Sequence, residues 1–293
     1  MNRRDRLQGY LFAIGASGGL GAAVALSRAA YNGGTDPLSI ATVRTVVGVL
    51  LVGALCLASG RNLRIPWKVW WHCVGLGLLM SVAFYGNIGA VRYIPVGLAA
   101  LLFFVYPPLV AIIMAAMDRK WLGLVTCLSL AMSFCGLGVM LGVSVGDVDW
   151  RGVVISLTAG TACALNVVWV GRAMRDVDVF VMTFHMTLAA CVALSIISVL
   201  SGGLVFPETG TGWLGAGGVV LCQAASIPFF YAAIPRIGAE NTAMMNNLQP
   251  VASIALAWFL FSETLSLIQA LGGMMVIGGI LLMQWHGTRK ARR

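Results

Sequence analysis

Charged residues, prolines and glycines interrupt this chain at regular intervals, and the stretches between them are apolar almost all round. An α-helix needs about 20 apolar residues to cross the hydrocarbon core of a bilayer. Ten stretches have that length: 7–28, 37–58, 69–91, 95–117, 121–142, 152–171, 179–200, 213–234, 240–261 and 265–285. None shows the alternation of a membrane β-strand, so the pattern predicts ten transmembrane helices.

The overall composition agrees with this prediction. Of the 293 residues, 59% are hydrophobic and only 10% are charged, whereas a soluble domain carries roughly a quarter charged residues. The mean hydropathy is +0.91. A water-soluble core could not bury this much apolar surface, so the sequence predicts an all-α polytopic membrane protein.

The Lys and Arg residues are distributed unevenly between the two sides of the membrane. If the N-terminus is cytoplasmic, 15 of the 19 lie in cytoplasmic segments, Arg44 falls within a span, and the outer segments hold Arg28, Arg92 and Arg151. This bias sets the orientation of a membrane protein. We therefore expect a multi-pass protein of the cell inner membrane with both termini in the cytoplasm. The net charge of +9 reports topology and does not indicate nucleic acid binding.

The two halves of the chain are related to each other. A shift of 143 positions aligns the apolar stretches without gaps and pairs identical residues: Gly9 with Gly152, Ala16 with Ala159, Trp70 with Trp213, Gly75 with Gly218, Ile94 with Ile237, Pro107 with Pro250, and Gly136 with Gly279. Each half has five spans, an odd number, so residues 150–293 would enter the membrane inverted relative to residues 1–145. Two inverted five-helix repeats are typical of secondary transporters, whose substrate site lies where the repeats meet.

Several enzyme and cofactor motifs are absent from the sequence. There is no Gly-rich phosphate loop ending in Lys–Ser/Thr and no HExxH zinc motif. The seven cysteines fall inside apolar runs, with no CxxC pair and no histidine at metal-ligating spacing. We therefore expect no enzyme activity, no metal and no cofactor.

The segment 239–282 carries a recognisable set of features. They are Pro250–Val251 in mid-helix, Glu263 closing that helix, then Thr264–Leu265, Gln269, Gly272 and the Gly278–Gly279 pair. With these features and the ten-span repeat, the chain resembles the EamA-type branch of the drug/metabolite transporter superfamily over nearly its whole length. In the first half Pro107 keeps the proline, but Asp118–Arg119–Lys120 stands where the glutamate motif would fall.

Within that superfamily the chain is most similar to the bacterial aromatic amino acid exporters. The resemblance implies ten helices, cytoplasmic termini and alternating access around a central cavity. Helices three, four, eight and nine would line that cavity, and helices one, two, six and seven would act as gates.

Polar side chains on span nine are the first substrate-binding candidates, because such groups are costly at membrane depth. Thr242, Asn246, Gln249 and Ser253 are spaced to share one helical face. The 143-residue shift pairs Asn246 with Phe103 and Gln249 with Tyr106. An amide face opposite an aromatic face would suit a solute with a polar head and an apolar side chain, such as an amino acid.

Other spans supply further candidates for the cavity. They are Gln223 on span eight, Met80, Phe84 and Asn87 on span three, and Asn166 and Trp169 on span six. The alternative for the polar members is that they hold helices together through hydrogen bonds.

Arg44, His185 and Pro228 are the gate candidates. Arg44 lies about two turns into span two from the outer side, and His185 about two turns into span seven from the inner side. Both could pair differently in two access states, and Pro228 could act as a hinge in span eight. The alternatives are an Arg44 that snorkels outward, a packing histidine and a packing kink.

Two transport functions fit these features. The favoured one is export of aromatic and other neutral or amphiphilic amino acids and related metabolites, by facilitated diffusion or exchange, because no acidic residue reaches the midplane to couple protons. The alternative is efflux of drugs or lipophilic cations, which could be coupled to protons. That function would favour an acidic residue or a cage of aromatic side chains deep in the membrane. The expected partners are an amino acid-like solute and the lipid bilayer. Small-xxx-small pairs leave both a monomer and a homodimer open.

Overall fold

The computed structural model describes residues 3–142, 149–174, 176–261 and 266–290, and within them it contains helices and no strand. The helices are α1 (Arg3–Asn32), α2 (Pro37–Ala58), α3 (Trp67–Gly89), the short η1 (Ala90–Arg92), α4 (Val96–Phe103), α5 (Tyr106–Met117), α6 (Leu124–Met140), α7 (Trp150–Ala173), α8 (Val179–Leu200), α9 (Gly210–Ile237), α10 (Ala239–Met245), α11 (Leu248–Phe261) and α12 (Leu267–Lys290).

These helices make the ten predicted spans. Eight helical stretches of the described chain are long and apolar enough to cross a bilayer, and α4 with α5 counts as one of them. The other two spans are α6, which is shorter at 17 residues, and α10 with α11. The prediction of an all-α, ten-span membrane protein is confirmed.

Spans four and nine, predicted as continuous helices, are each broken in two. The breaks lie at Phe104–Val105 and at Asn246–Asn247. Pro107 and Pro250 follow them, and each lacks the N–H that would bond the carbonyl four residues earlier, on Phe103 and Asn246. The two breaks coincide, within one residue, under the 143-residue shift. The repeat therefore extends to the irregular parts of the fold.

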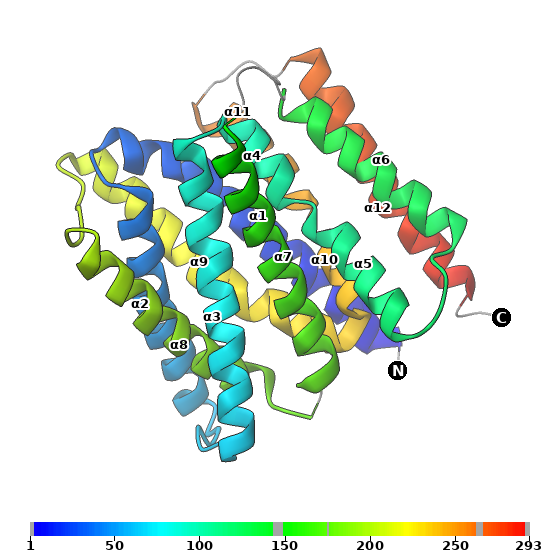
Figure 1. Ribbon diagram of the computed structural model, residues 1–293, viewed down its shortest axis with the longest axis horizontal. Helices are drawn as coiled ribbons and strands as arrows, with labels where there is room; N and C mark the ends of the chain where they lie inside the picture. The colour runs from blue at the N-terminus through cyan, green and yellow to red at the C-terminus, as the bar shows by residue number, and fades with distance from the viewer. Residues whose placement is uncertain (1–2, 143–148, 175, 262–265, 291–293) are drawn as a thin grey trace.

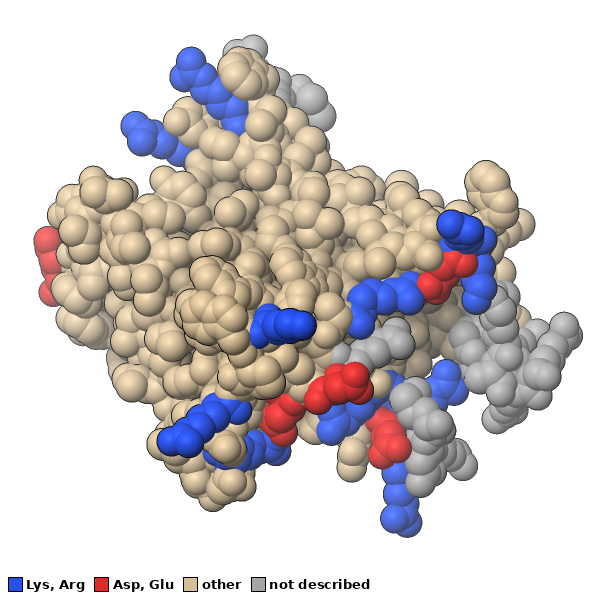
Figure 2. Space-filling view, turned by 60° about the horizontal axis from the view of Figure 1, so that its bottom comes forward, with Lys and Arg blue, Asp and Glu red and all other residues tan. Residues whose placement is uncertain are grey.

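Both chain ends lie toward the lower right of the protein in Figure 1, and the loops that follow α2, α5 and α7 lie on the same side, along its bottom and lower right. We call this side the termini face and the other side the opposite face. Figure 2 brings the termini face forward and shows Lys and Arg side chains along it, with acidic side chains beside them. Which face meets the cytoplasm stays a prediction from the Lys and Arg bias.

The inverted repeat is visible where α6 packs against α12. Helices α6 and α12 are repeat equivalents and run side by side (Figure 1). The Ser133 hydroxyl on α6 donates a hydrogen bond to the carbonyl of Val276 on α12, at 3.2 Å. A Cβ added at Gly279 would lie 2.7 Å from the Ser129 carbonyl oxygen, and one at Gly136 would lie 2.8 Å from the Gly272 carbonyl oxygen. Glycine at both equivalent positions therefore allows the two backbones to touch.

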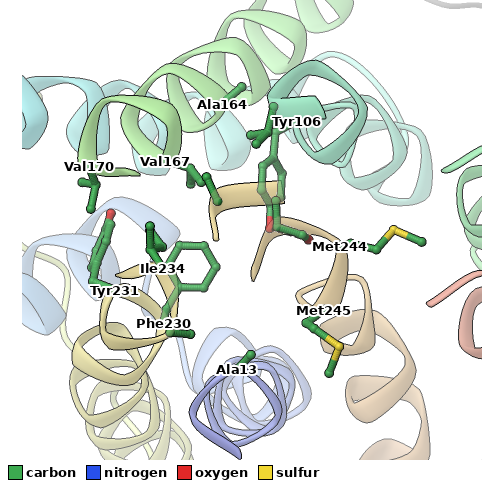
Figure 3. Packing of buried hydrophobic residues seen from close by; sticks show 14 of the residues in the cluster. Ala13, Tyr106, Ala164, Val167, Val170, Phe230, Tyr231, Ile234, Met244 and Met245 are labelled. Atoms are coloured by element: carbon green, nitrogen blue, oxygen red, sulfur yellow. Dashed lines mark hydrogen bonds between the residues drawn. The ribbon is translucent and has the colours of Figure 1, made fainter. Parts of the chain in front are cut away.

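Toward the termini face the helices close on a group of buried side chains, which we call the termini-side core. Figure 3 shows side chains of α1, α5, α7, α9 and α10 converging there. Its labelled members are Ala13, Tyr106, Ala164, Val167, Val170, Phe230, Tyr231, Ile234, Met244 and Met245. Because lipid chains are as apolar as these residues, close packing rather than exclusion of water holds them together.

Candidate functional site

A cavity of about 690 Å³ lies between the two repeats, in the half of the protein nearer the opposite face. Helices α1, α2, α4, α9 and α11 form most of its wall. Rim residues such as Val96 and Trp258 are 64% and 55% exposed, whereas Arg44 and Gln223 at its floor are each 9% exposed. The cavity therefore runs from the opposite face to the middle of the protein, where the termini-side core closes it.

Arg44 and Gln223 form the polar floor of the cavity. The Arg44 Nη1 donates a hydrogen bond to Gln223 Oε1 at 2.5 Å. The guanidinium carbon lies 3.8 Å from the centroid of the Phe84 ring on α3, a cation–π contact. These two contacts hold the charged end of Arg44 at depth, so the side chain does not snorkel to the surface.

Helix α11 supplies a second polar wall through Gln249 and Ser253. Asn246 is buried beneath the cavity, and its Nδ2 donates a hydrogen bond to Gln249 Oε1 at 3.2 Å. The Ser17 Oγ on α1 lies 3.4 Å from Asn246 Oδ1. Asn246 therefore orients Gln249 and leaves the Gln249 amide N–H groups available to a solute.

Phe103 and Phe104, where α4 ends, supply an aromatic wall. Their ring centroids are 5.6 Å apart in an edge-to-face arrangement. Tyr106 packs behind both rings at 5.7 and 6.0 Å, but it is 1% exposed and belongs to the termini-side core. The cavity thus places two aromatic rings together with two polar surfaces.

Three other predicted substrate contacts lie away from the cavity. Asn166 donates to the Leu76 carbonyl at 2.8 Å and accepts from the Tyr231 hydroxyl at 2.8 Å, so it links α7 to α3 and α9. Trp169 donates to His72 Nδ1 at 3.2 Å, and Met80 is buried in the core. The structure does not bring these three to Gln249. The side chain of Asn87 lies outside the described residues.

Of the three gate candidates, one lines the cavity and two do not. Arg44 lines the cavity, but His185 does not: its Nε2 lies 2.8 Å from the Leu63 carbonyl, in the segment that joins α2 to α3. Pro228 is buried inside α9, which continues through it as one helix from Gly210 to Ile237. A hinge role for Pro228 and a gate role for His185 stay predictions.

The sequence analysis missed the contribution of α1 to the cavity, since the resemblance assigned helix one to the gates. Ser27, Arg28 and Tyr31 line the cavity near the end of α1. Small residues at Ala23 and Ser27, one turn apart, would have been the available signal.

The cavity lining carries positive charge. Arg28 and Arg44 are both in it, and no Asp or Glu occurs among the described residues that line it. A solute that reaches the floor of the cavity therefore meets the guanidinium of Arg44.

Comparison with known proteins gives the same architecture. The EamA-like transporter family matches residues 7–142 and 150–285, one match in each repeat. An uncharacterized transporter of Archaeoglobus fulgidus is 26% identical over 253 residues, which cover 86% of this chain and 88% of that protein. The uncharacterized transporter YvbV of Bacillus subtilis is 28% identical over 151 residues, 49% of this chain and 48% of its own. A solved crystal structure matches 99% of both chains with a TM-score of 0.80 at 20% identity, a likeness of fold alone.

Proposed function

Because the chain belongs to the EamA-like transporter family, we propose that it is a secondary transporter that exports aromatic and other neutral, amphiphilic amino acids. The observation that carries the proposal is the composition of the cavity, which combines two polar surfaces with an aromatic one. Under the Lys and Arg bias, the termini face would lie in the cytoplasm of the inner membrane and the cavity would open outward.

The size and chemistry of the cavity suit such a solute. Small-molecule sites commonly have volumes of about 300–1,000 Å³, and this cavity has about 690 Å³. Gln249 and Ser253 can hydrogen-bond the charged groups of an amino acid, while Phe103 contacts its side chain. Small differences in the apolar part would be tolerated, because one methylene in an apolar pocket changes affinity only modestly.

Alternating access follows from the position of the cavity between inverted repeats. Export would require the termini-side core to separate while the cavity half closes around the solute. No acidic side chain lines the cavity among the described residues, so we propose facilitated diffusion or exchange in place of direct proton coupling.

Efflux of lipophilic cations is the second candidate function. The aromatic rings Phe103 and Phe104 favour it, since a cation binds well over ring faces. Arg44 opposes it, because like charges repel strongly where water is scarce. The amino acid function is therefore the better supported of the two.

Transport into proteoliposomes that contain only this protein tests the proposal. We expect saturable entry of radiolabelled phenylalanine without a pH gradient, and Gln249→Ala to reduce it by about 10-fold or more, the usual effect of losing a hydrogen bond to a charged group. Gln8→Ala, which removes an exposed amide of α1 outside the cavity, is the matched control. Entry of a lipophilic cation but not of phenylalanine, or flux that requires a pH gradient, would contradict the proposal.

A further inference from the structure

We infer that Arg44 binds the carboxylate of the transported solute, and that this charge pairing makes the cavity select zwitterions and anions over cations. The inference rests on the proposed function and deepens it, because it names the chemical group that the site recognises and the residue that recognises it.

The first argument is the missing counter-ion of Arg44. The residue lies seven positions after Pro37, roughly 10 Å along α2 at 1.5 Å per residue, and is 9% exposed. An arginine stays protonated in a protein. No carboxylate of the described residues pairs with it; the ion pairs of Arg61 with Asp178 and of Arg172 with Asp118 lie on the termini face. A buried cation without a partner is costly, and an anionic solute would offset that cost.

The second argument is the number of N–H donors that Arg44 leaves unused. A guanidinium has five donors in a planar fork, and the hydrogen bond to Gln223 is the one that it makes within the described part of the chain. Its Nε is buried without a hydrogen-bond partner. The remaining donors match the two oxygens of a carboxylate, which arginine binds in a bidentate manner.

The third argument is that the guanidinium is already held in place. Gln223 on α9 fixes one end of it, and the Phe84 ring on α3 covers one of its faces at 3.8 Å. Two neighbouring spans thus orient the fork before a solute arrives, and a pre-organised site loses less entropy on binding. Gln223 is in this sense a positioning residue, and Arg44 is the binding residue.

The fourth argument comes from the rest of the lining. An ammonium group in the cavity finds only neutral acceptors, such as the Ser253 hydroxyl, among the described lining residues. A zwitterion gains its ion pair through the carboxylate and keeps its ammonium group on these acceptors. A pure cation gains no ion pair and is repelled by Arg44. The carboxylate should therefore contribute more to the binding affinity and selectivity of the cavity than any other group of the solute.

Calorimetric titration of the purified protein in lipid nanodiscs tests the inference with four related compounds. Phenylalanine carries both charges, 3-phenylpropanoate only the carboxylate, and phenylalaninamide and phenethylamine only the ammonium. We expect the first two to bind at least about 10-fold more tightly than the last two, since a hydrogen-bonded charge pair contributes about that factor or more.

Substitution of Arg44 then assigns the effect to this residue. Arg44→Gln should weaken phenylalanine and 3-phenylpropanoate by about 10- to 100-fold and leave phenethylamine unchanged or tighter. Arg44→Lys should retain the preference for a carboxylate in part, because it keeps the charge and loses the fork. Arg151→Gln removes an exposed cation that lies outside the cavity, and it should change none of the four affinities.

The outcomes separate this inference from the proposed function. Amino acid transport with equal binding of phenylalanine and phenylalaninamide would overturn the inference and leave the function standing. Arg44-dependent binding of 3-phenylpropanoate without binding or transport of any amino acid would overturn the proposed function and leave the carboxylate site at Arg44 standing. If Arg44→Gln does not fold, the affinities of the unmodified protein for the four compounds still test the inference. Equal affinities would contradict a carboxylate site.

Discussion

The half of the protein toward the opposite face is hollow and the half toward the termini face is filled, although equivalent positions of the two repeats build both. Three residues that line the cavity have partners, 143 positions away, in the termini-side core: Val24 and Val167, Val91 and Ile234, Gln249 and Tyr106. The same backbone framework thus supports an open and a closed arrangement. Under the proposed alternating-access mechanism, a protein with one open half and one closed half is in one of its two access states.

The two halves also differ in polarity. Arg44 of the hollow half corresponds to Thr187 on α8, and Gln223 corresponds to Met80. The filled half can therefore close without burying a charge. Closing the hollow half over an empty cavity would bury Arg44 without an anion, which is costly. The comparison teaches that the buried charge of Arg44 lies on the side that is open in this structure, whereas its equivalent on the filled side is uncharged.

The largest expected effect comes from adding the same bulk to each half. Ala100 lines the cavity, whereas its partner Ala243 is 0% exposed. Ala243→Phe should lower the free energy of unfolding by about 1–3 kcal/mol, because it overpacks a closed region. Ala100→Phe should leave stability within about 0.5 kcal/mol and reduce transport by narrowing the cavity. Thermal unfolding and proteoliposome uptake measure the two effects; equal loss of stability would show that the halves are equally packed.

A smaller effect is expected from the ion pair between Asp118, which follows the last residue of α5, and Arg172 on α7; this pair joins the two repeats at the termini face. The positions equivalent to Arg172 and Asp118 in the hollow half, Ala29 and Phe261, are uncharged. Both partners are partly exposed, so Asp118→Asn should favour opening of the filled half by only about 0.5–1 kcal/mol, a two- to five-fold change.

A cysteine introduced at Val170, which is 4% exposed in the termini-side core, reports on this opening. Its reaction rate with a water-soluble thiol reagent should rise two- to five-fold with Asp118→Asn, by the free-energy change given above. The exchanged pair, Asp118→Arg with Arg172→Asp, is the control and should restore the original rate. A rate that stays constant would mean that this ion pair does not help to hold the filled half closed.

The smallest effect concerns the equivalent of Arg44 in the filled half. The Thr187 Oγ1 is buried without a hydrogen-bond partner, and a buried hydroxyl without a partner is unfavourable. Thr187→Val should therefore raise the free energy of unfolding by about 0.5–1 kcal/mol. Thr183→Val on the same helix is the control, because the Thr183 hydroxyl donates to the Val179 carbonyl at 2.6 Å, and it should not stabilise. Equal unfolding temperatures for both variants would contradict the expectation.

The sequence predicted part of the candidate site and not the rest. Phe103, Gln223 and Gln249 line the cavity as predicted contacts, because polar and aromatic groups at depth stand out in an apolar span. Helical spacing predicted that Asn246 faces the cavity, and the 143-residue shift predicted the same for Tyr106, yet both are buried below the cavity. The break at Asn246–Asn247 separates α10 from α11, and a spacing argument that assumes one continuous helix cannot include that change.

The sequence by itself determined the number of spans, the inverted repeat and the family. These features are local or additive: each span must satisfy its own backbone and cross the same thickness of lipid, and a shift of the chain against itself compares them directly. Only the tertiary structure decided which half is hollow and that Arg44 meets Gln223 and Phe84. A pattern that repeats every 143 residues is the same in both repeats, so it cannot predict which half of the protein is hollow. That difference depends on packing among spans far apart in the chain.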